Sequence, residues 1–313
     1  MSAPVEFRPA TPADVPSLHA LWAEAFPGTH VAELHARDPG GLARTFLAVR
    51  VVTVVAAVHY LPRRIRDGAG GVDLVGGVAN VATRVDARGQ GHIRRLLELA
   101  GAAMAADGCA WSLLFTGTPG VYLSSGYRPF TLRYASGRPV TGTASVPPGW
   151  TVHAPDSVDW TELAGIHAAF NAHRPLSTVR DAADWALRVP LWYAPPARTL
   201  VARHRGRPVG YLVARWSPGH VRVVEVAVRP DRPDALPVLF GAVARAAAGH
   251  DVRRCTARLP ADPAIVAALP ALLTEPETEY DETGMVRPVH AAPEHVRAVV
   301  EAPDAFHWPA DYL

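Results

Sequence analysis

The sequence predicts an α/β (α+β) protein built from two domains in tandem, each a mixed sheet flanked by helices. At 313 residues the chain is too long for one ordinary domain and fits two of about 150. Short β-rich runs alternate with runs whose apolar residues step by three and four, which is helical spacing. The motif at 44–48 (RTFLA) returns at 198–202 (RTLVA), and other short matches follow in the same order. We therefore expect a degenerate duplication.

The expected boundaries follow from turn-forming residues. Proline and glycine are dense between residues 138 and 150 and indicate a linker. We predict a first domain at 1–138, a linker at 139–150, and a second domain with a C-terminal tail at 151–313.

Composition excludes several classes of protein. Hydrophobic content of 49% and charged content of 19% are typical of a folded globular chain. A net charge of +2 argues against a nucleic-acid binder, and no apolar run approaches the ~20 residues that span a membrane. The two cysteines, Cys109 and Cys255, lie far apart, which suits a reducing cytoplasm. No histidine shows metal-ligand spacing, so we expect no metal.

The first domain is expected to begin with a short strand and a helix. Thr11-Pro12-Ala13-Asp14 has the hydroxyl cap, proline and acid of a helix start, and Pro27-Gly28 ends that helix. A second short helix is expected at 31–36. Further segments are rich in β-branched and aromatic residues and are expected to be strands: 45–49, 51–61, 72–85 and 111–115.

The central feature of the chain runs from Val78 to Ile93 and into the following helix. An apolar run is broken after Val85, and Arg88-Gly89-Gln90-Gly91 precedes the helical pattern. Glycines allow backbone N–H groups to approach a ligand closely, and a helix start carries partial positive charge. Together with the Arg88 guanidinium, this unit predicts a cradle for phosphate.

The order of motifs after this loop supports a more specific interpretation. A helix leads to Asp107-Gly108, a strand at 111–115, and then the stretch from Tyr122 to Tyr127. This order resembles the GNAT N-acetyltransferases, which depend on acyl-CoA and carry the loop pattern Arg/Gln-x-x-Gly-x-Gly/Ala. Arg88 and Gly91 match that pattern, whereas Ile93 replaces its last small residue.

A bulky aliphatic after the loop is also seen in the enhanced intracellular survival (Eis) branch, whose Tyr-x-x-Phe-Gly-Tyr stretch is similar to residues 122–127. The resemblance covers about residues 5–135. That branch also carries a third, sterol-carrier-like domain, for which this chain is too short, so the resemblance there is partial.

The resemblance implies acetyl-CoA as co-substrate. It implies that the backbone at Val81, Ala82 and Thr83 pairs with the pantetheine amides. Around the pyrophosphate, it implies contacts from the loop and the helix start: Arg88, Gly89, Gln90, Gly91, His92, Ile93 and Arg94.

The resemblance also implies catalytic roles. The expected acid is Tyr122, whose phenol would protonate the leaving thiolate. The expected base is the C-terminal carboxylate at Leu313; Glu24 or a water held by Asn80 are alternatives.

The acceptor cleft in GNAT enzymes is roofed by the first two helices. Trp22, Glu24 and Phe26 are therefore candidate substrate contacts; the alternative for Trp22 and Phe26 is that they are simply core residues. Asp311 is a further candidate, because Glu24, Asp38, Asp304 and Asp311 would attract a cation if they met in the cleft.

The second domain differs where the cradle would be. Prolines and carboxylates at 230–237 replace the glycine loop, and proline removes N–H donors. We expect this domain to keep the fold without the phosphate site. Its last strand is expected at 285–290, followed by a helix at 293–300 and an aromatic tail.

The resemblance implies an enzyme, an acyl-CoA N-acyltransferase. It would move an acetyl group directly to a primary amine of a cationic small molecule, antibiotic- or aminoglycoside-like, or of a peptide. One alternative is a non-catalytic protein that binds acyl-CoA or an antibiotic. Another is a scaffold whose tandem domains form a homo-oligomer.

Overall fold

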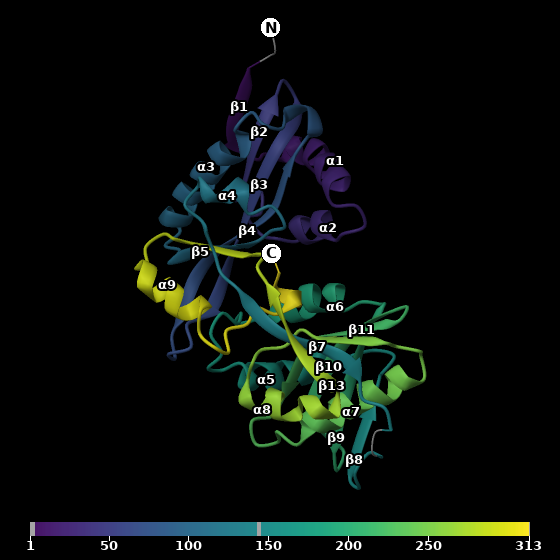
Figure 1. The fold of residues 1–313 in the computed structure, drawn as a ribbon. Coiled ribbons are helices and arrows are strands. Elements are labelled where there is room, and N and C mark those ends of the chain that lie inside the picture. The colour runs from purple at the N-terminus through teal and green to yellow at the C-terminus, as the bar shows by residue number, and fades with distance from the viewer. Residues whose placement is uncertain (1–3, 143–144, 313) are drawn as a thin grey trace.

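The protein consists of two α/β units stacked end to end, with the N-terminus at the far end of the first unit and the C-terminus between them (Figure 1). The computed structural model describes residues 4–142 and 145–312. Each unit contains a seven-stranded mixed sheet with helices on both faces. The predicted fold class is confirmed.

The first sheet has the order β1-β2-β3-β4-β5-β14-β6. Its strands are β1 (Val5–Pro9), β2 (Thr45–Arg50), β3 (Thr53–Arg66), β4 (Val72–Thr83), β5 (Trp111–Phe115), β6 (Arg128–Pro129) and β14 (Gly284–Pro288). Its helices are α1 (Val15–Ala25), α2 (Val31–Ala36), α3 (His92–Ala106) and α4 (Gly120–Leu123).

Strand periodicity decides which helix covers which face of the first sheet. Along β2, Phe46 and Ala48 pack with the α3 side chains, whereas Leu47 and Val49 pack with those of α1. Successive strand residues point to opposite faces, so the two helices cover opposite sides. Both faces are buried, which explains why β2 reads as a continuous apolar run rather than an alternating one.

The second sheet has the order β13-β7-β12-β11-β10-β9-β8. Its strands are β7 (Leu132–Pro139), β8 (Trp150–His153), β9 (Ala197–His204), β10 (Arg207–Ser217), β11 (His220–Val228), β12 (Arg254–Ala257) and β13 (Leu273–Asp281). Its helices are α5 (Trp160–Phe170), α6 (Val189–Trp192), α7 (Ala235–Ala248) and α8 (Pro263–Ala268). The last helix, α9 (Pro293–Val300), packs instead on β5 and β14 of the first sheet.

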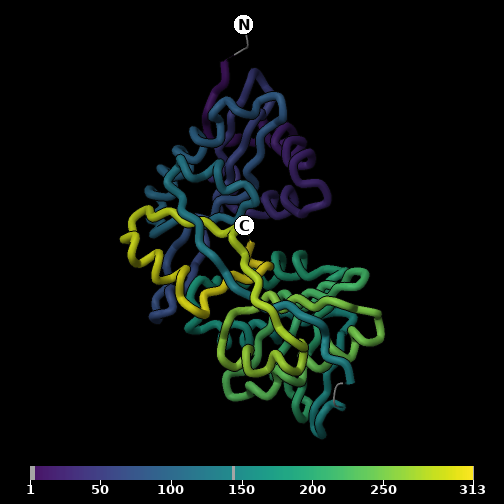
Figure 2. Tube along the Cα trace, in the orientation of Figure 1, coloured from purple at the N-terminus to yellow at the C-terminus, as the bar shows by residue number. Residues whose placement is uncertain are grey.

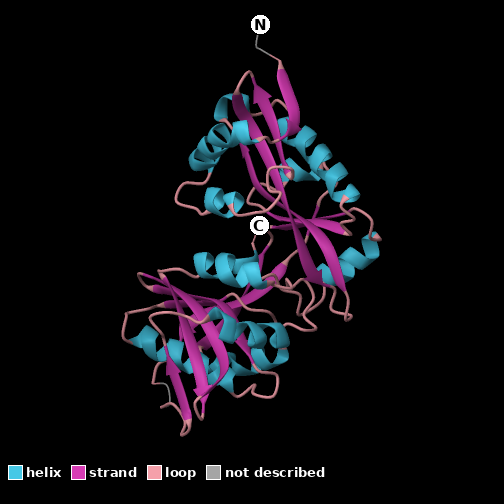
Figure 3. Cartoon of the chain, turned by 180° about the vertical axis from the view of Figure 1, so that it is seen from behind, coloured by secondary structure: helices cyan, strands magenta, loops and turns pink. Residues whose placement is uncertain are grey.

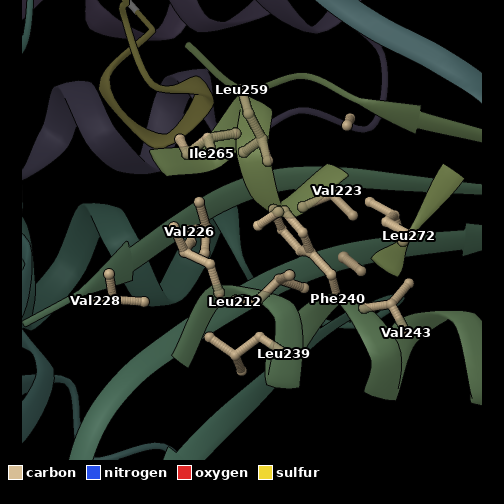
Figure 4. Packing of buried hydrophobic residues seen from close by; sticks show 14 of the residues in the cluster. Leu212, Val223, Val226, Val228, Leu239, Phe240, Val243, Leu259, Ile265 and Leu272 are labelled. Carbon is tan, nitrogen blue, oxygen red and sulfur yellow. The ribbon is translucent and has the colours of Figure 1, made fainter. Parts of the chain in front are cut away.

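The second unit repeats the two-faced packing of the first. Leu212 of β10 lies in the core against α7, with Phe240 at its centre (Figure 4). The neighbouring residues Tyr211 and Val213 pack against α5 on the other face. Both units therefore have a long helix after their central strands: α3 follows β4, and α7 follows β11.

The two sheets exchange strands (Figure 3). β7 follows the first unit in sequence but lies between β13 and β12 of the second sheet. β14 returns from the second half and pairs with β5, Met285 opposite Leu114. The expectation that 285–290 is the last strand of the second domain is therefore wrong. The predicted boundaries at 138 and 150 stay a prediction, although both sheets draw strands from across them.

The C-terminal tail is buried between the units, where the tube in Figure 2 runs from the outer helix α9 back toward the centre of the molecule. Phe306 and Trp308 belong to the core of the second unit. Asp311 is fully buried, and its carboxylate accepts a hydrogen bond of 2.8 Å from Arg180. The same guanidinium makes a two-pronged pair with Glu225.

Among the helices in the described part of the chain, none combines the length and the hydropathy that crossing a bilayer requires. Within the same residues, no group of three or more His, Cys, Asp or Glu side chains is gathered as a metal site would need.

Candidate active site

The loop between β4 and α3 has the backbone that the glycines were predicted to provide. Gly89 and Gly91 have φ angles of 74° and 76°, in the left-handed region that side chains disfavour. Gly91 is the residue that caps α3, so the first N–H groups of the helix have no acceptor inside it. The loop is exposed and Arg88 lies beside it. Backbone donors, a helix N-terminus and a guanidinium thus converge on one place suited to an anion.

Two predicted loop contacts can act only through their backbone. The His92 side chain is 7% exposed and packs against the ring of Phe7, with centroids 5.6 Å apart. Burial lowers the pKa of this imidazole, so it is neutral and turned into the protein. Ile93 packs against the core of the first unit. The expectation of a His92 side chain meeting phosphate is corrected here.

The other loop side chains are accessible. Arg94 is exposed, and Gln90 donates to the Asp86 carbonyl at 3.3 Å. The Arg88 guanidinium lies 3.5 Å from the Thr83 carbonyl.

β4 separates from β5 beyond its middle. The parallel pairing of these strands covers only Val75–Gly77. A bulge in the pairing with β3 lies at Asn80, whose φ is 53° and whose carbonyl accepts a 2.9 Å hydrogen bond from the Trp22 indole. On the β5 side, the end of β4 that carries Val81, Ala82 and Thr83 is therefore left open. The resemblance found in the sequence predicts that the pantetheine arm lies at this open end of β4.

A cavity of about 760 Å³ lies at this split, between the two units. The first unit contributes the ends of β4 and β5, part of β3, and α2. The second unit contributes α6, the turn at 194–196, and Arg215 of β10. Both halves of the chain are thus needed to enclose it.

Tyr122 lines this cavity from α4 and is 7% exposed. Its ring meets that of Tyr127 edge-on, with centroids 6.0 Å apart. Burial raises the pKa of the Tyr122 phenol to about 12. The hydroxyl therefore stays protonated near neutral pH and can donate a proton, as the predicted acid must.

Of the predicted substrate contacts, one lines the cavity and three do not. Phe26 lines it. Trp22 is buried in the α1 core, so the alternative reading of this residue as core is the correct one. Glu24 is exposed, 3.9 Å from Arg84. Asp311 is 0% exposed and paired with Arg180, so it cannot reach a substrate without breaking a buried ion pair.

The predicted base, Leu313, lies outside the described residues. Its neighbour Tyr312 lines the same cavity as Tyr122. The tail is held there by a 2.7 Å hydrogen bond from Arg188 to the Tyr312 carbonyl.

The cavity also contains two residues to which the sequence gave little or no role. Asp38 was only one of four acids proposed to attract a cation, and it is the one that lines the cavity. His59 also lines it, 3.6 Å from Asp38. The sequence signal that could have identified His59 is its position as a single histidine inside the apolar strand from Val54 to Tyr60.

The second unit lacks the phosphate cradle. α7 begins after Arg232-Pro233-Asp234, and the Arg232 guanidinium is paired with the Asp234 carboxylate at 2.9 Å. A paired guanidinium beside a carboxylate is poorly suited to hold pyrophosphate.

Comparison with known families matches residues 6–130 to the model of the acetyltransferase (GNAT) domain. These residues form a GNAT acetyltransferase domain. This agrees with the prediction of an acyltransferase enzyme. A search of curated proteins found no match.

Solved structures extend the likeness in fold to both halves of the chain. A probable N-acyltransferase from Enterococcus faecalis V583 has 18% identity and a TM-score of 0.71, over 92% of this chain and 73% of that one. Eis1 from Mycobacterium abscessus has 16% identity and a TM-score of 0.67, over 91% and 74%. A tandem GNAT protein from the clavulanic acid biosynthesis pathway has 17% identity and a TM-score of 0.52, over 92% and 100%. The chain thus has the tandem-GNAT fold that the sequence predicted.

Proposed function

We propose that this protein transfers an acetyl group from acetyl-CoA directly to a primary amine. The observation that carries the proposal is the continuity of the site: the glycine loop, the open end of β4 and the Tyr122 cavity follow one another along the split between β4 and β5. The pyrophosphate would lie on the N–H groups from Gly89 to Arg94, with the pantetheine arm beside Val81, Ala82 and Thr83. The thioester would then reach the cavity.

In the proposed step the amine nitrogen attacks the thioester carbonyl carbon. The new C–N bond forms, the C–S bond breaks, and the thiolate takes a proton from the Tyr122 phenol. Freeing the lone pair of an alkyl ammonium of pKa near 10.4 at pH 7 costs about 4–5 kcal/mol, so a base is needed for the amine's own proton. We keep the Leu313 carboxylate as the proposed base, because the adjacent Tyr312 lines the cavity.

As acceptor we propose a primary amine of a small molecule or peptide, including antibiotic-like amines. The shape of the site supports a small acceptor, since the cavity has room for one and is lined on one side by the second unit.

The test is thioester consumption with a panel of primary amines, comparing the native chain with Tyr122→Phe. Loss of a positioned acid predicts a fall in kcat of about 10²–10⁴-fold with little change in acetyl-CoA binding. The control is Tyr280→Phe, because Tyr280 is exposed in β13 and outside the cavity. Absence of CoA release with every amine, despite acetyl-CoA binding, would favour the non-catalytic alternative.

A further inference from the structure

Two hydrogen-bond acceptors face each other on the wall of the cavity. Nε2 of His59 lies 3.6 Å from Oδ2 of Asp38, and both residues line the cavity. Oδ1 of Asp38 accepts a 2.6 Å hydrogen bond from Arg44. Oδ2 is buried, and it has no hydrogen-bond partner in the described part of the chain. A buried carboxylate oxygen without a donor is costly, which makes this position unusual.

The tautomer of His59 follows from its neighbour Thr45. The Thr45 hydroxyl donates to the Gly41 carbonyl at 2.7 Å, so its oxygen accepts from Nδ1 of His59 at 3.0 Å. The proton of the neutral ring is therefore on Nδ1, and Nε2 carries a lone pair. The gap between Nε2 and Oδ2 consequently contains no donor.

Burial is the main reason that this imidazole stays neutral. Burial, the neighbouring His35, and the guanidiniums of Arg44 and Arg188 lower the pKa of His59 to about 3. A ring that stays neutral cannot satisfy Oδ2 of Asp38 by taking up a proton. The described residues therefore leave Oδ2 without a donor, and a ligand in the cavity can supply one.

We propose that Asp38 and His59 form a subsite that binds an ammonium group of the acceptor. A primary ammonium carries three N–H donors, so it can bridge two acceptors 3.6 Å apart and donate to the carboxylate oxygen that Arg44 leaves free. A hydroxyl offers one donor and no charge. This inference rests on the proposed acetyl transfer, since it assigns the class of acceptor to the same cavity.

The subsite also limits the charge of the acceptor. Arg188, the residue just before α6, lines the same cavity, and Arg215 lines it from β10. A second ammonium near these guanidiniums would be repelled. The subsite therefore favours an acceptor with one positive charge in the cavity over a compact polycation.

The experiment measures binding of benzylamine and benzyl alcohol to the full chain by calorimetry at pH 7. The two probes have similar size and differ in charge and donor number. We expect the native chain to bind benzylamine at least tenfold more tightly than the alcohol. Asp38→Asn should abolish this preference, and the control Glu294→Gln, at an exposed carboxylate in α9 outside the cavity, should keep it.

Two variants of His59 separate recognition from folding. In His59→Asn the amide can replace Nδ1 and hold Thr45, while the distal acceptor is lost, so the preference for benzylamine should fall. In His59→Gln the amide oxygen can replace Nε2, so the preference should be largely retained. Equal binding of the two probes by the native chain, or an unchanged preference in Asp38→Asn and His59→Asn, would overturn the proposal.

These outcomes are separable from those of the proposed reaction. Probe binding requires no turnover. Failure of this subsite would thus leave acetyl-CoA binding and CoA release with other amines unaffected.

Discussion

The ring of Tyr312 stacks on the ring of Phe115, with centroids 4.4 Å apart and planes 9° apart. Phe115 ends β5 in the first sheet, whereas Tyr312 follows the buried tail of the second unit. The contact lies at the cavity, which both residues line. The tail therefore contributes to the cavity as well as to the fold. We expect a mutation that removes its anchor to affect both.

The buried anchor of the tail gives a stability prediction. Asp311→Ala should lower the free energy of unfolding by about 3–5 kcal/mol, because it removes one partner from a buried ion pair and leaves the charge of Arg180 less compensated. Urea unfolding followed by circular dichroism measures this change. Asp86→Ala, at an exposed carboxylate paired with Arg84, is the matched control and should change stability little. Equal effects of the two variants would show that the tail is not anchored here.

The glycine loop gives a prediction about the cofactor. Gly91→Ala should raise the KM for acetyl-CoA about tenfold, because a side chain is strained by about 1–2 kcal/mol at a φ of 76° and the loop would relax. The expected loss is in binding rather than in kcat. Gly165→Ala is the control, since Gly165 lies in α5 with open space around it. An unchanged KM in Gly91→Ala would mean that the loop does not hold the nucleotide.

The strand exchange shows what the sequence could not reveal. The sequence predicts a strand at 285–290 but none at 132–139. The partner of a strand is set by contacts far away in the chain. Local pattern therefore assigned 285–290 to the wrong sheet. By contrast, the loop from Arg88 to Gly91 and the helix after it were predictable, since glycine spacing and helical periodicity are local signals.

The residues of the candidate site were also predictable only in part. Tyr122 and Phe26 were found from motif and position, and both line the cavity. His59 was missed, because its role depends on Asp38 from another segment. The sequence left Trp22 open between a substrate contact and a core residue, since an apolar helix residue has the same pattern whether it faces a core or a cleft.

The buried histidines give a prediction about pH. Burial is the main cause that lowers the pKa of six histidines in the folded state: five are buried (His35, His59, His92, His167 and His307), and His220 is half-buried. Below the ordinary histidine pKa of 6.5 the unfolded chain binds more protons than the folded chain, so stability falls as pH falls. Each group adds a slope of up to about 1.4 kcal/mol per pH unit between its two pKa values.

Urea midpoints measured from pH 7.5 to pH 4.5 check this dependence. His59→Gln should make the slope shallower than in the native chain. A midpoint that stays constant, or rises, on acidification would contradict the buried neutral histidines.

The assigned acid gives a prediction about the rate profile. With its pKa raised to about 12, the Tyr122 phenol stays protonated across the working range. At saturating amine, kcat should therefore show no falling limb below about pH 11. Stopped assays of CoA release from pH 6 to pH 10 measure the profile. A falling limb centred near pH 9 would point to a different proton donor.

The central claim is that the loop beside Gly89 and Gly91 holds acetyl-CoA, and calorimetric titration of the full chain tests it most directly. We predict saturable binding to one site per chain, because only the first unit has the cradle, and weaker binding by Arg88→Gln. No binding heat at millimolar acetyl-CoA, or a second equal site per chain, would contradict the account.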